Sequence, residues 1–224
     1  MTFRYCVLFG TVAAALISES AISQVPTSVE FRVGVHTAST KRNVSVSDGV
    51  VDRTSSSLKG IEADITALGG GPGIGGRILD GTFGGAKMSL KEGRVFVGAD
   101  YFRIEGAFGQ RSLYGTDSLF LFTRGGARST IRIGGSGVAV MLSGSKYFKG
   151  DFQNKKSATT TTAGSTSIST DPDGWEGETG LSYSTPKVPV FVQIGYRSEY
   201  FKLGTRAEHS SGLVLQTGLW LGGR

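Results

Sequence analysis

The chain has 224 residues, 35 of them glycine, and a formal net charge of +6. Its glycine share is about twice the usual value, while 10% aromatic and 19% charged residues exclude a disordered tail. The only cysteine, Cys6, lies near the start, which excludes a disulfide framework, a thiol nucleophile and a cysteine-ligated metal in the remainder. No basic patch with interleaved aromatic residues indicates a nucleic-acid partner.

The first 23 residues are predicted to be a cleavable signal peptide. Arg4 precedes an apolar run at residues 7–17, and small residues follow at Ala21 and Ser23. The run is too short for a membrane-spanning helix, which needs roughly 20 apolar residues. We therefore expect an exported protein in which residues 24–224 form a single domain.

Ten later segments alternate apolar and polar side chains with a period of two, which is typical of β-strands with two different faces. Val190, Val192 and Ile194, for example, alternate with Phe191 and Gln193. In chain order the predicted strands span about 28–38, 57–68, 74–84, 92–98, 101–110, 118–133, 138–148, 175–184, 188–201 and 211–222.

The connections alternate between short and long. Tight turns follow Leu68, Gly98, Ile133 and Ser184, and polar loops follow the other strands. The longest loop, at about 149–173, is of low complexity and is predicted to be mobile and extracellular. In outer-membrane barrels short turns face the periplasm and long loops face outward, so ten strands bring both chain ends to the periplasmic side.

This pattern predicts an all-β fold: a closed, antiparallel, up-and-down transmembrane β-barrel with ten strands, or with eight as the alternative. A closed barrel leaves no strand edge unpaired in hydrocarbon. A soluble secreted barrel or sandwich is the other reading of the alternation. The residues predicted to face lipid are Val29, Phe31, Val33, Val35, Ile61, Ile65, Phe102, Ile104, Leu119, Leu121, Ile131, Val138, Val140, Leu142, Val188, Val190, Val192, Ile194, Leu213, Leu215 and Leu219.

The opposite faces carry charges of both signs, and we expect these to pair inside the barrel, because small barrels are generally filled by side chains. The predicted lumen residues are Glu30, Arg32, Glu62, Asp64, Arg77, Arg103, Glu105, Arg124, Arg128, Arg132, Glu176, Glu178, Arg197 and Glu199. A second set of cations is predicted in or near the long loops, where it could meet lipopolysaccharide phosphates: Lys41, Arg42, Arg111, Lys146, Lys149, Lys155, Lys156, Lys202 and Arg206.

With its signal, its strands and its final segment 213–221, the chain resembles the small bacterial outer-membrane β-barrel proteins. This group contains the transmembrane domain of outer membrane protein A and the opacity-type adhesins. The resemblance implies an outer-membrane location, contact with lipid and lipopolysaccharide, and insertion by the barrel-assembly machinery. The last strand of the group usually ends in an aromatic residue, whereas here Gly222, Gly223 and Arg224 follow Trp220 and Leu221.

These features favour a structural or surface-interaction role that needs no catalysis, cofactor or metal. A small passive channel is the first alternative. The second is a lipid A hydrolase, because His209 and Ser211 share a strand face, with Glu208 beside them, and so resemble the His-x-Ser arrangement of outer-membrane lipid A deacylases. A protease of the omptin type also has ten strands, but no matching acidic motif is evident here.

Overall fold

The computed structural model describes residues 28–45, 51–68, 72–83, 86–99, 101–112, 118–154, 173–185, 188–203 and 206–222. The predicted signal peptide lies outside these residues. Ten strands make up the fold: β1 (Ser28–Ser45), β2 (Val51–Leu68), β3 (Pro72–Phe83), β4 (Ala86–Ala99), β5 (Phe102–Ser112), β6 (Ser118–Arg132), β7 (Val138–Asn154), β8 (Asp173–Ser184), β9 (Val190–Leu203) and β10 (Arg206–Gly222).

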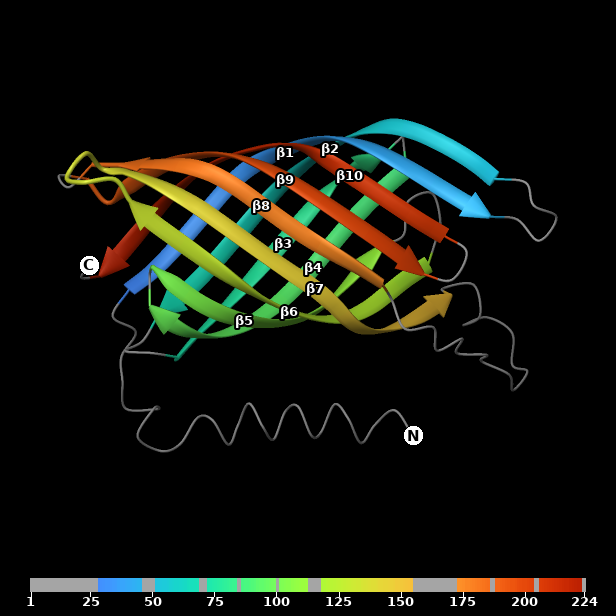
Figure 1. Ribbon diagram of the computed structural model, residues 1–224, viewed down its shortest axis with the longest axis horizontal. Coiled ribbons are helices and arrows are strands. Elements are labelled where there is room, and N and C mark those ends of the chain that lie inside the picture. The colour runs from blue at the N-terminus through green and yellow to red at the C-terminus, as the bar shows by residue number, and fades with distance from the viewer. Residues whose placement is uncertain are drawn as a thin grey trace.

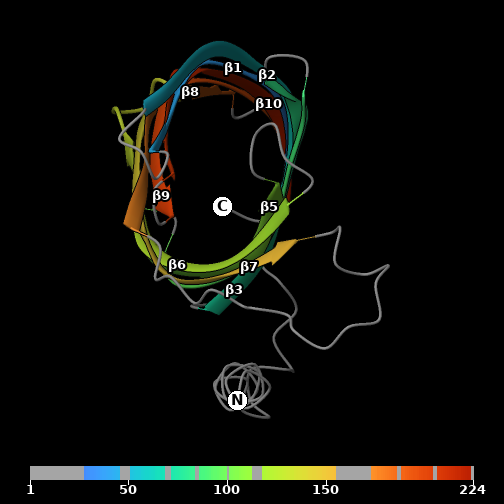
Figure 2. The ribbon, with the colours of Figure 1, turned by 90° about the vertical axis from the view of Figure 1, so that its right-hand side faces the viewer.

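Each strand pairs antiparallel with the next, and β1 pairs with β10, so the sheet closes into a barrel (Figure 1). Seen from one end, the strands form an oval ring (Figure 2). The prediction of a closed antiparallel barrel with ten strands is confirmed, and the eight-strand alternative is wrong. Within the part of the chain that the structure describes, no helix has the length and apolar character to cross a membrane.

Several strands extend further toward the long-loop end than their alternation predicts. β1 continues to Ser45 and pairs in unbroken register with β2 from Val51 onward. The backbone ladder persists there although the residues are polar on both faces, so the apolar period of two ends before the strand does. For the same reason Lys149 and the residues up to Asn154 belong to β7, and the prediction of a loop at 149–154 is wrong. Residues 155–172 lie outside the described residues.

The outer surface of the barrel is largely apolar. Most of the residues predicted to face lipid point outward with exposures between 38% for Val33 and 68% for Ile61, and Val29, Leu121, Val138, Val140 and Val190 are half-exposed. Val188 is exposed but precedes β9, and the side chain of Leu119 lies outside the described residues. This arrangement inverts that of a water-soluble protein, because the large apolar side chains face out and the charges face in.

Aromatic side chains border this apolar surface at both ends. Tyr101, Phe102 and Tyr183 are exposed near the turn end, and Phe148 and Trp175 are exposed toward the loop end. Trp175 and Tyr183 lie eight residues apart on β8, which for a tilted strand corresponds to about 20 Å along the barrel axis. That height is close to the apolar band of outer-membrane barrels, about 25 Å between two aromatic girdles.

Two short turns at the opposite end from the long loops are joined by backbone hydrogen bonding. Ser184 N donates to the carbonyl oxygen of Gly137 at 2.8 Å. Gly137 has a φ of 75°, and a Cβ there would collide with the Ser184 carbonyl oxygen. Only glycine combines this φ with so close an approach, so these residues hold the β6–β7 and β8–β9 turns together.

Candidate functional site

The alternation of each strand places its charged side chains inside the barrel. Arg32, Glu62, Arg77, Glu178 and Arg197 are each less than 9% exposed although they carry full charges. An isolated charge in such a place would be costly, whereas paired and hydrogen-bonded charges are tolerated. The interior is therefore an ionic network, and its geometry decides what the lumen can do.

One ion pair crosses the whole lumen. Arg77 on β3 donates from Nη1 and Nη2 to the two carboxylate oxygens of Glu176 on β8, at 3.0 and 2.9 Å. These strands lie five positions apart in a ring of ten, which is the greatest separation possible. Arg124 on β6 extends the crossing, because its guanidinium lies 2.7 Å from Glu176 and 2.6 Å from Glu92 on β4.

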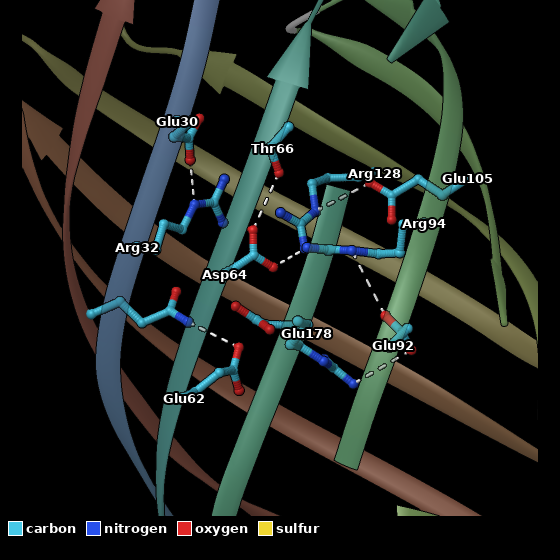
Figure 3. Close-up of polar contacts among 12 residues, drawn as sticks. Glu30, Arg32, Glu62, Asp64, Thr66, Glu92, Arg94, Glu105, Arg128 and Glu178 are labelled. Atoms are coloured by element: carbon cyan, nitrogen blue, oxygen red, sulfur yellow. Dashed lines mark hydrogen bonds and ion pairs between the residues drawn. The ribbon is translucent and has the colours of Figure 1, made fainter. Parts of the chain in front are cut away.

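A second group of pairs lies beside this crossing. Arg197 on β9 bonds bidentately to Glu62 on β2 and also donates to Glu178 on the neighbouring β8. Arg94 pairs with Asp64, which also accepts a hydrogen bond from Thr66 at 3.2 Å. Figure 3 shows Glu62 and Asp64 from β2, Arg94 from β4 and Glu178 from β8 pointing into one shared space. The middle of the lumen is thus filled by charges that neutralise each other.

Toward the loop end the filling becomes aromatic. Phe120 and Phe201 meet edge to face with ring centroids 4.7 Å apart, and Tyr147 lies 5.3 Å from both Phe122 and Phe201. Such contacts are worth about 0.5–1.5 kcal/mol beyond the burial of the rings. The guanidinium of Arg111 lies over the Phe201 ring, 4.7 Å from its centroid, and these rings belong to one cluster of buried side chains.

A second crossing lies within this aromatic layer. Arg111 on β5 reaches Glu199 on β9 at 2.5 Å and Glu208 on β10 at 3.4 Å. β5 and β10 are again five positions apart. The hydroxyl of Tyr147 donates to Glu199 at 2.6 Å, so the aromatic and ionic contacts support each other.

The turn end of the lumen is hollow by comparison. A partly open cavity of about 510 Å³ reaches the β6–β7 and β8–β9 turns. Arg32, Arg103, Arg128, Arg132, Phe191 and Trp220 are among the residues that line it, and the guanidinium of Arg32 lies over the Phe191 ring, 5.7 Å from its centroid. A much smaller space of about 20 Å³ lies deeper, between Arg94, Glu105 and Arg124, and has room for about one water molecule.

The structure places the predicted lumen residues on the inner side of the barrel. Arg132 is the most exposed of them, since it lies at the turn end where it lines the cavity. Reasoning from sequence missed Glu92 and Arg94, although both alternate with the outward-facing Val95 and Val97 and could have been found from that pattern.

Arg111 was predicted among the cations near the long loops, and that prediction is wrong. Its side chain is 4% exposed and lies inside the barrel, because β5 continues to Ser112 instead of ending at Gln110. Lys146, Lys149 and Lys202 are exposed on the outer surface. The side chains of Lys41, Arg42, Lys155, Lys156 and Arg206 lie outside the described residues.

The structure divides the three candidate catalytic residues between the two faces of β10. Glu208 is 2% exposed and points into the lumen toward Arg111. His209 is exposed on the outer surface, where its Nε2 lies 3.2 Å from Ser198 Oγ, and Ser211 shares that outer face. Glu208 therefore does not contact His209 in this structure, because adjacent residues of a strand point in opposite directions. Among the described residues, no three metal-binding side chains come together.

The sequence matches no protein-family model and no curated protein. The chain is similar in structure to the outer membrane protease OmpT from Escherichia coli, with a TM-score of 0.52 and 10% identity over 91% of this chain and 99% of OmpT. The fold is that of a bacterial outer-membrane β-barrel. Together with the apolar exterior, it places the protein in the outer membrane, as predicted.

Two other solved barrels are also similar. Neisserial surface protein A is 18% identical, with a TM-score of 0.39 over 84% of this chain and 96% of its own. Ail, the attachment invasion locus protein of Yersinia pestis, is 15% identical, with a TM-score of 0.32 over 86% and 99%.

Proposed function

We propose that this outer-membrane barrel is plugged and acts as a structural and surface-interaction protein, not as a passive channel. The observation that supports this most directly is the Arg77–Glu176 pair, which joins opposite walls of the barrel through two hydrogen bonds. An ion that passed this level would have to separate two buried opposite charges. Separation without replacement partners costs several kcal/mol, roughly 3–5.

The aromatic layer supports the same proposal from a different direction. Phe120, Tyr147 and Phe201 are at most 2% exposed and lie between the ion pairs and the loop end. A hydrated path through the lumen would have to cross this apolar layer as well. Two successive barriers of different chemistry make a conducting state costly.

The outer surface near the loop end supports an interaction with lipopolysaccharide. Lys59, Lys87, Lys146 and Lys202 are exposed there on β2, β4, β7 and β9. In the outer membrane this part of the barrel would meet the phosphate groups of the outer leaflet, to which ammonium groups are attracted. Insertion would depend on the barrel-assembly machinery, with β10 closing the barrel against β1.

Conductance measurements test the plugged barrel directly. Refolded protein, verified by heat-modifiable gel mobility, is expected to give no conductance steps in planar bilayers. A matched variant, Glu176→Ala combined with Phe201→Ala, weakens both layers and is expected to conduct more than the wild type. Reproducible steps from the wild-type barrel would contradict the proposal and favour the small-channel alternative.

A further inference from the structure

The turn-end cavity is lined by both cationic and apolar side chains. Arg103 on β5 and Arg128 on β6 are among the cationic ones. Met141, Phe191 and Trp220 are among the apolar ones, and the rings of Phe191 and Trp220 are stacked with centroids 5.9 Å apart. Its volume of about 510 Å³ lies within the range of about 300–1,000 Å³ that small-molecule sites have.

Among the described residues that line this cavity, arginines outnumber carboxylates. Arg32, Arg103, Arg128, Arg132 and Glu30 line it, and Glu105 lies behind it. Glu30 pairs with Arg32. Glu105 accepts a hydrogen bond from Arg103 at 2.6 Å and lies 3.7 Å from Arg128 Nε. In the described part of the chain, Arg103 and Arg128 therefore share one carboxylate, Glu105.

Several buried polar atoms at this cavity lack a hydrogen-bond partner. They are Nη2 of Arg103, Nε and Nη1 of Arg128, and Oε1 of Gln193. The side chain of Arg103 is only 6% exposed. Buried donors left without partners are costly, and guanidinium groups match carboxylate and phosphate oxygens in geometry as well as charge. The unused donors are therefore suited to an anion.

We propose that this cavity is a binding site for a small organic anion. Its carboxylate or phosphate group would meet Arg103 and Arg128, and its aromatic or aliphatic part would lie against Phe191 and Met141. Because short turns face the periplasm in outer-membrane barrels, the ligand would enter from the periplasmic side. This site goes beyond the structural and surface role proposed above, since the Arg77–Glu176 crossing closes the lumen whether or not the cavity is filled.

Calorimetric titration of the refolded, detergent-solubilised full-length protein tests the proposal. Phenyl phosphate is the main probe. Inorganic phosphate supplies its anionic group without the ring, and phenol supplies the ring without the phosphate. Phenyl phosphate is expected to bind one to one and more tightly than either half, and its affinity should fall as salt rises. Arg128→Gln should weaken it about tenfold or more, because a charge-assisted hydrogen bond is lost. Lys91→Gln removes an exposed cation from the outer surface of β4 and should leave the affinity unchanged.

A second variant tests the cavity without changing any charge. Ala139 is 7% exposed and lines the cavity on β7, so Ala139→Phe should occupy the space of the ligand and weaken phenyl phosphate as well. Gel mobility verifies the fold of each variant, and if Arg128→Gln does not fold, Ala139→Phe alone decides the question. The site is overturned if phenyl phosphate gives no saturable heat, or if the folded cavity variants bind it as tightly as Lys91→Gln does. Inorganic phosphate binding as tightly as phenyl phosphate would overturn the apolar half of the site.

Discussion

Removing one side of the Arg77–Glu176 crossing should destabilise the barrel by an amount that depends on which side is removed. Breaking a buried ion pair by deleting one partner costs about 3–5 kcal/mol. In Arg77→Met, Glu176 keeps its ion pair with Arg124 at 2.7 Å. The free energy of unfolding should therefore fall by an amount near the lower limit, about 3 kcal/mol. In Glu176→Gln, the ion pair that Arg77 keeps among the described residues is the longer one to Glu92, at 3.9 Å, so the free energy of unfolding should fall by an amount near the upper limit, about 5 kcal/mol.

The double variant Arg77→Met with Glu176→Gln should lose less unfolding free energy than the two single variants lose in total. Residues in direct contact within one network show coupling energies of about 0.5–3 kcal/mol. For a bidentate pair we expect a coupling energy near the upper end of this range. The double variant should therefore lose about 5–6 kcal/mol of unfolding free energy instead of the additive value of about 8 kcal/mol.

Reversible denaturant unfolding of the barrel in lipid vesicles measures these losses, with fluorescence of Trp175 and Trp220 reporting the transition. Lys202→Gln, an exposed change on the outer surface, is the matched control and should stay within about 0.5 kcal/mol of the wild type. Losses that add to within about 0.5 kcal/mol would show that the two residues are not coupled, which would refute the crossing and the plug built on it.

Three further predictions concern other parts of the barrel. Ile194→Arg on the lipid-facing surface should cost about 2–4 kcal/mol in vesicle unfolding, and a loss below about 1 kcal/mol would argue against a lipid contact there. Phe201→Ala should cost about 3–5 kcal/mol in the same assay through loss of the aromatic layer, and an unchanged midpoint would contradict that layer. His209→Ala and Ser211→Ala should leave lipid A unchanged in mass spectrometry of the host membrane, since Glu208 points away from both; altered lipid A would restore the hydrolase alternative.

The alternation of side chains was enough to predict the ten strands and their two faces. Val192 and Gln193 are neighbours, and the strand geometry alone sends one to the lipid and the other to the lumen. The strand ends could not be predicted this way, because β1 and β7 continue where both faces are polar and the period of two disappears. The same effect hid Arg111, which follows the end of the predicted fifth strand and yet lies inside the barrel.

The sequence by itself determined which side chains face the lipid and which face the lumen. Each residue's polarity decides this, because the surrounding hydrocarbon accepts apolar side chains on a sheet whose backbone groups are all paired. Only the tertiary structure decided which charges meet. Arg77 and Glu176 are 99 positions apart, and they face each other because ring closure and strand register put β3 opposite β8. The same closure left Arg103 and Arg128 to share Glu105 at the turn end. Both outcomes depend on strands that are far apart in the sequence, so no local pattern of residues could predict them.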